Sequence, residues 1–97
     1  MDLHISRLTA GERVLARDLF AMMAEVFEEE CEQLGDSYLN LLLSRNDFWA
    51  LAALSGHEIV GGLTAHTLPM TRSESSEIFI YDIAVRRDHQ RKGVGDV

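Results

Sequence analysis

The stretch from Ile78 to Gly95 constrains the fold more than any other part of this 97-residue chain. It begins with an apolar run, residues 78–85, in which Asp82 is the only charged residue. Alternate side chains of a strand point to opposite faces, and here both faces are apolar, so the run predicts a strand buried on both sides. By the same alternation Asp82 lies on the face opposite to Tyr81 and Ile83. A carboxylate in such a setting needs a cationic or hydrogen-bonding partner.

A short basic loop that contains two glycines follows this run. Residues 90–95 read Gln-Arg-Lys-Gly-Val-Gly. Glycines allow backbone N–H groups to approach a ligand closely, and Arg91 and Lys92 add positive charge. The loop therefore predicts a site for an anionic group such as pyrophosphate. On the glycine spacing alone, an ordinary polar loop is an equal alternative.

The strand and the loop together resemble motif A of the GNAT N-acetyltransferases, in which Gln/Arg-x-x-Gly-x-Gly/Ala binds the pyrophosphate of acetyl-coenzyme A. Gln90, Gly93 and Gly95 match that pattern. The resemblance covers nearly the whole chain and is greatest to the aminoglycoside 3-N-acetyltransferases. The segments that carry it are residues 36–39, 48–53, 60–69 and 76–85. The resemblance implies acetyl-coenzyme A as cosubstrate, and no pair of histidines has the spacing of metal ligands.

The resemblance also implies roles for individual residues. Asp82 is expected to act as the general base on the acceptor amine, and Tyr81 is expected to orient it through its hydroxyl group. A bulge in the strand that ends at Val85 is expected to expose backbone groups to the pantetheine arm. The predicted cofactor-binding residues are Ile83, Ala84, Val85, Gln90, Arg91, Lys92, Gly93, Val94 and Gly95. A core role for Tyr81 and a structural role for Asp82 are the alternatives.

Acidic residues gather at the C-terminal end of the first predicted helix, between Glu25 and Asp36. Negative charge there opposes the helix dipole, and pairs such as Glu25 and Glu29 repel each other. Binding of a small cationic amine would explain this arrangement. A solvated acidic surface without a function is an equal alternative. The predicted substrate-binding residues are Glu28, Glu29, Glu32, Asp36 and Asp82.

The composition excludes several classes of partner. The net charge of −7 argues against nucleic acid, because phosphate contacts need an extended basic surface. The apolar runs are shorter than the ~20 residues that cross a bilayer, so no membrane association is expected. The single cysteine, Cys31, cannot form an internal disulfide, which agrees with a cytoplasmic protein.

The hydrophobic pattern predicts an α+β fold with two helices packed on a mainly antiparallel sheet. The first helix is expected to span Ala10–Glu30, with Thr9 and Glu12 forming a capping box. Gly61 and Gly62 interrupt a strand, which indicates a bulge or a close approach by substrate or cofactor. The other expected elements are a strand at 3–8, a helix at 36–43 and strands at 48–54, 59–68 and 77–85.

Compared with the family that it resembles, the chain is expected to be the N-terminal part of one domain, incomplete after the pyrophosphate loop. Residues 10–45 then form the acceptor-side helices, and residues 47–95 form the sheet and the cofactor motif. The sequence thus predicts an acetyl-coenzyme A-dependent aminoglycoside N-acetyltransferase that confers antibiotic resistance. The alternative is a catalytically silent module that dimerises or pairs with a separate C-terminal half. The open edge of strand 77–85 predicts a homodimer.

Overall fold

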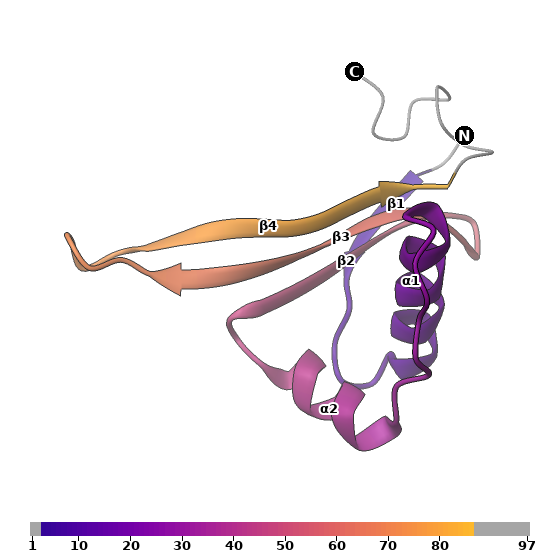
Figure 1. The fold of residues 1–97 in the computed structure, drawn as a ribbon, viewed down its shortest axis with the longest axis horizontal. Coiled ribbons are helices and arrows are strands. Elements are labelled where there is room, and N and C mark those ends of the chain that lie inside the picture. Colours follow the sequence, from indigo (N-terminus) through magenta and orange to yellow (C-terminus); the bar gives the residue numbers. More distant parts are fainter. Residues whose placement is uncertain (1–2, 87–97) are drawn as a thin grey trace.

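The structure, a computed structural model that describes residues 3–86, has two helices on one face of a four-stranded antiparallel sheet (Figure 1). Its elements are β1 (Leu3–Arg7), α1 (Arg13–Val26), α2 (Asp36–Ser44), β2 (Phe48–Ser55), β3 (Glu58–Pro69) and β4 (Ser76–Val85). The strands lie side by side in chain order, and each pairs with the next in antiparallel fashion. The predicted α+β class and the order of the elements are confirmed.

The core lies between the helices and the sheet. Each helix contributes large apolar side chains at helical spacing, among which Leu19 of α1 and Leu39 of α2 are completely buried. The sheet meets them with small side chains, namely Ala50, Ala52 and Ala84. The small residues of the sheet leave room for the large residues of the helices, so the two layers approach closely.

Gly62 is located where this approach is tightest. A Cβ atom on Gly62 would lie 2.4 Å from Cδ1 of Leu19 and 2.6 Å from the carbonyl oxygen of Leu51. The backbone oxygen cannot move aside easily, so the position requires glycine. Beside it, the β2–β3 register shifts, because Ala53 pairs with Gly61 whereas Leu54 pairs with Ile59. A bulge and a close neighbour within the chain therefore account for the glycine pair.

The helix α1 is shorter than predicted at its N-terminal end. The N–H and the hydroxyl group of Thr9 both donate to Oε1 of Glu12, at 3.0 and 3.1 Å, so the two predicted capping residues do interact. They form a turn ahead of the helix, however, and the first helical residue is Arg13. Neither helix within residues 3–86 is long and apolar enough to cross a membrane.

At its other end α1 stops at Val26, so the predicted extension through Glu30 was wrong. The N–H of Glu28 donates to the oxygen of Glu25 at 3.1 Å, and the N–H of Glu29 donates to the oxygen of Ala24 at 2.8 Å. Glu28 has a φ of 57°. This is a Schellman ending with glutamate in the left-handed position where glycine is usual, which is why the sequence does not signal it.

The prediction that β4 is buried on both sides was also wrong. Among the described residues β4 is an edge strand paired only with β3, and Figure 1 shows the β3–β4 hairpin extending well beyond the helices. The large apolar side chains of β4 are exposed on both faces, because the face opposite the helices has no cover within residues 3–86 and the hairpin extends beyond the helices on the other face. These side chains are Ile78, Phe79, Ile80, Tyr81 and Ile83.

Candidate acceptor groove and cofactor strand

A β-bulge in β4 sets the directions of Tyr81 and Asp82. Thr64 of β3 pairs with Asp82 and Ala65 pairs with Ile80, so Tyr81 is an extra residue with no Cα partner on β3. A bulge re-aims the side chains beside it. Asp82 faces α1, and the ring of Tyr81 contacts His66 on the same side of the sheet. The expectation that Tyr81 and Asp82 lie on opposite faces was wrong, because simple alternation does not count the extra residue.

The half-buried Asp82 lies in a groove of about 230 Å³ between the end of α1 and the sheet. Three acidic residues from two segments line it, Asp82 of β4 and the consecutive Glu29 and Glu30 that follow α1. The hydroxyl-bearing side chain of Thr64, which is buried, lies across the strand from Asp82. The remaining lining residues are Phe20, Met23, Ala24 and Phe27 of the α1 region. The arrangement is an acidic groove with an apolar floor and wall.

The helix ending explains why two of these carboxylates reach the groove. At Glu28 the chain turns in the left-handed conformation, and Glu29 is hydrogen-bonded back to Ala24 in the last turn of α1. This reversal brings Glu29 and Glu30 against the helix end instead of along its axis. A left-handed conformation is unfavourable for a residue with a side chain. The backbone is therefore strained at Glu28, the residue at which the chain turns Glu29 and Glu30 toward the groove.

Other members of the predicted acidic set lie elsewhere. Glu32 lines another depression beside α1, of about 280 Å³, together with Arg17 and Cys31. Asp36, the first residue of α2, forms an ion pair with Arg17. The hydrogen bond and the charge of Arg17 lower the pKa of the Asp36 carboxyl group. The structure thus brings Asp82 together with Glu29 but not with Glu32 or Asp36, whose substrate roles stay predictions, as does that of Glu28.

Sequence reasoning selected Asp82 and Glu29 but not the other residues of the groove, among them Glu30, Thr64 and Phe27. Glu30 belongs to the acidic segment, but only the position of the helix end decides which glutamates face the sheet. Thr64 is opposite Asp82 only because of the bulge. Within residues 3–86 no group of three or more His, Cys, Asp or Glu side chains is placed to hold a metal ion.

The predicted cofactor strand is regular at its end. Ile83 pairs with Leu63, Ala84 with Gly62, and Val85 with Gly61. The bulge that the resemblance implies for this strand is present, but it lies at Tyr81, before these three residues. The predicted pyrophosphate-binding residues Gln90, Arg91, Lys92, Gly93, Val94 and Gly95 lie outside the described residues, and their role stays a prediction.

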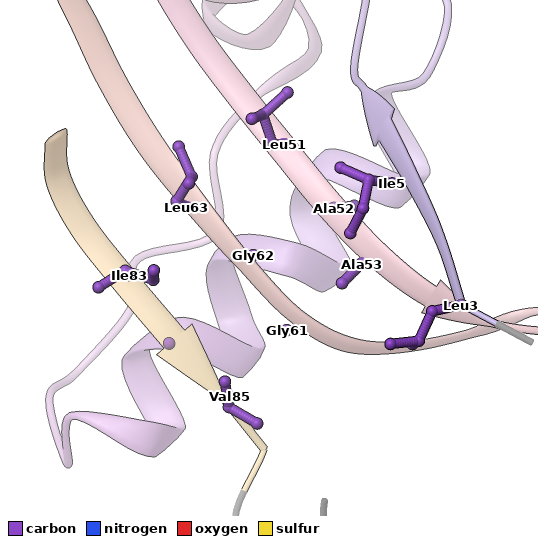
Figure 2. A pocket seen from close by; sticks show the side chains of 11 residues that line it. Leu3, Ile5, Leu51, Ala52, Ala53, Gly61, Gly62, Leu63, Ile83 and Val85 are labelled. Carbon is purple, nitrogen blue, oxygen red and sulfur yellow. The ribbon is translucent and has the colours of Figure 1, made fainter. Parts of the chain in front are cut away.

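The sheet face opposite the helices carries a second, apolar groove of about 270 Å³ (Figure 2). Figure 2 shows side chains from all four strands converging on this face, with a helix behind the sheet. The large side chains among them are Leu3, Ile5, Leu51, Leu63, Ile83 and Val85. None of the described residues that line this groove is charged, so within residues 3–86 the two faces of the sheet offer opposite chemistry.

Comparison with known proteins identifies relatives of this fold and site. The model of the acetyltransferase (GNAT) family matches residues 14–96. An aminoglycoside acetyltransferase, HMB0005, from an uncultured soil metagenomic sample is 39% identical, with a TM-score of 0.91 over 97% of this chain and 64% of that one. No curated protein matches the chain.

Two further solved structures are informative. The aminoglycoside acetyltransferase meta-AAC0020, from an uncultured soil metagenomic sample and in complex with sisomicin, is 35% identical, with a TM-score of 0.89 over 96% of this chain and 62% of that one. AAC(6')-Iy, in complex with the bisubstrate analogue CoA-S-monomethyl-acetylneamine, shares the fold at 13% identity and a TM-score of 0.74, over 98% and 65%. The chain spans less than two thirds of the length of each of these proteins.

Proposed function

Since the chain belongs to the acetyltransferase (GNAT) family, we propose that it transfers the acetyl group of acetyl-coenzyme A to an amine of an aminoglycoside, namely the amine at position 3. The observation that carries this proposal is the acidic groove, in which Asp82 faces Glu29 and Glu30. Several carboxylates around one groove favour a ligand with several ammonium groups. The similarity to meta-AAC0020, whose structure holds sisomicin, supports the same ligand class. Antibiotic resistance would be the consequence in a cell.

In the proposed reaction Asp82 is the general base. It accepts a proton from the bound ammonium group, and the neutral amine then attacks the carbonyl carbon of the thioester. A C–N bond forms and the C–S bond breaks. The nitrogen gives up a second proton as it becomes an amide, and the departing thiolate takes up a proton, so that coenzyme A leaves as the thiol. The position of Asp82 in the acidic groove, beside the apolar side chains of α1, suits this role, because a general base must lie within reach of the amine that it deprotonates. The hydroxyl group of Tyr81, the neighbouring residue, is proposed to orient Asp82.

Acetyl-coenzyme A is proposed to lie along the end of β4. Within residues 3–86 only β3 pairs with this strand, and an edge strand presents one row of backbone N–H and C=O groups away from its neighbour. Such a row matches the amide groups of the pantetheine arm. Ile83, Ala84 and Val85 would hold the arm, and the loop from Gln90 to Gly95 would hold the pyrophosphate.

Coenzyme A release in the presence of sisomicin tests the proposal. We expect Asp82→Asn to lower the rate by about 10²–10⁴-fold, the usual effect of losing a general base, with little change in the Kd for acetyl-coenzyme A. Glu74→Gln, an exposed change in the loop between β3 and β4, is the matched control. Equal rates for the two variants would contradict the proposal, and an equal loss of cofactor binding would make Asp82 a structural residue.

A catalytically silent module remains the second candidate, because β4 and the apolar groove expose large side chains that suit a protein partner. In that case the chain pairs with a second copy or with a separate C-terminal half. Binding of acetyl-coenzyme A and sisomicin without release of coenzyme A would favour the module. Turnover by the purified chain would favour the enzyme.

A further inference from the structure

Three aromatic rings form a row beside Asp82, one from each of β2, β3 and β4. Phe48 is buried in the core, with 7% of its surface exposed, and pairs in register with His66. Their ring centroids are 5.4 Å apart. His66 then meets Tyr81 edge to face, at 6.1 Å and an interplanar angle of 87°. The row therefore begins in the core and ends at Tyr81, which is 67% exposed.

The bulge gives this row its position. Tyr81 is the extra residue of β4, so its ring lies on the helix side of the sheet, the side that also carries Asp82. Without the bulge, alternation would place Tyr81 and Asp82 on opposite faces. An exposed tyrosine next to the carboxylate is thus a product of the backbone geometry, and the edge-to-face contact with His66 restrains the orientation of its ring.

We propose that the ring of Tyr81 is a binding surface for the acceptor, and that His66 is a positioning residue that holds this ring. The proposal rests on the proposed function and specifies the substrate class further. An aromatic face attracts both a cation and the apolar C–H face of a saturated ring. Beside the carboxylate of Asp82, such a face suits an amino group carried on a sugar ring. A linear polyamine has the charges but lacks the ring face.

Calorimetric binding of sisomicin and of spermidine to the purified chain tests this assignment. Tyr81→Leu removes the ring, whereas Tyr81→Phe keeps the ring and removes only the hydroxyl group. We expect Tyr81→Leu to weaken sisomicin binding by about two- to fivefold, the usual effect of losing an exposed contact of this type. The effect on spermidine is expected to be smaller, and Tyr81→Phe is expected to bind sisomicin like the wild type.

The role of His66 has its own pair of variants. His66→Ala is expected to weaken sisomicin binding in the wild-type background but not in the Tyr81→Leu background, because His66 acts through Tyr81. His66→Phe, which preserves an aromatic edge, is expected to restore binding. Circular dichroism identifies any variant that fails to fold, and the conservative changes to Phe keep the test decisive in that case.

Each contrary result has a distinct meaning. If Tyr81→Leu binds sisomicin like the wild type while Asp82→Asn binds it weakly, the ring surface is overturned and the proposed function stands. If Tyr81→Phe is as weak as Tyr81→Leu, the hydroxyl group and not the ring makes the contact, which also overturns the inference. If Asp82→Asn releases coenzyme A as fast as the wild type in the presence of sisomicin, the proposed function itself fails.

Discussion

The two faces of the sheet are built from the same strands but from side chains of different size. On the face toward the helices the central positions are small, such as Ala52 and Ala84, and the helices fill the space above them. On the opposite face the large side chains Ile5 and Ile83 remain about 60% and 59% exposed. Small side chains therefore mark the sheet face on which the helices pack closely. Apolar character alone does not show whether a sheet face is packed against another element.

The two grooves also lie on opposite faces of the sheet. The acidic groove lies on the helix side, where α1 ends and the sheet continues past it. The apolar groove lies on the other side. The acidic residues Asp82, Glu29 and Glu30 thus lie at the edge of the packed core, where the groove is open to a ligand.

The sharpest test of this difference compares one large side chain from each side. Leu19→Ala removes a completely buried side chain of α1 and is expected to lower the free energy of unfolding by about 2–5 kcal/mol. In the monomer, at concentrations below the dimer Kd, Ile83→Ala removes a mostly exposed side chain and is expected to cost less than about 1 kcal/mol. Urea denaturation measures both. Equal losses would show that the second face is covered in solution.

A second test adds a methyl group instead of removing one. Gly62→Ala would place a Cβ atom against Leu19 and against the backbone of Leu51, and is expected to cost roughly 1–3 kcal/mol through overpacking. Gly11→Ala is the matched control, because no atom lies within 4 Å of its added Cβ. Thermal unfolding compares the two variants. If Gly62→Ala is as stable as Gly11→Ala, the inference that α1 packs too closely against Gly62 to admit a side chain is wrong.

The third test concerns the exposed face and the proposed homodimer. We expect the chain to sediment as a dimer at micromolar concentration, with β4 or its apolar face against the same surface of a second copy. A lysine at the interface must be desolvated, so Ile83→Lys is expected to raise the dimer Kd by at least about tenfold. Val14→Lys, at an exposed position of α1, is the control. A monomeric wild-type chain would contradict the homodimer.

The smallest expected effect is the pH dependence of the contact between Arg17 and Asp36. Arg17 lowers the pKa of the Asp36 carboxyl group below its ordinary value of 3.8. A depressed folded-state pKa means that the stabilisation is present above this pH and is lost as the pH falls through the folded-state value. Asp36→Asn is therefore expected to differ slightly from the wild type at pH 7 and to converge with it in acid. A difference that is independent of pH would contradict this origin.

The sequence predicted the helices and strands of this fold better than the positions where the backbone departs from regular geometry. Periodicity identified the helices and strands, and the glycine pair indicated a constraint that Leu19 now explains. It did not predict the end of α1, because Glu28 adopts a conformation that its residue type disfavours. The resemblance predicted a bulge in strand β4 but not its position at Tyr81, which depends on the pairing with β3. The composition of the acceptor groove follows from these two points, so it could be predicted only in part.

The exposed edge of β4 also affects how the protein behaves at high concentration. A long strand with an open edge and apolar side chains can add further strands, which leads to open-ended aggregation and not to a closed pair. The net charge of −7 opposes this by repulsion between chains. Salt screens that repulsion but leaves the apolar attraction intact. The colloidal stability of the protein therefore depends on ionic strength, and preparations are expected to stay clear longest in dilute buffer.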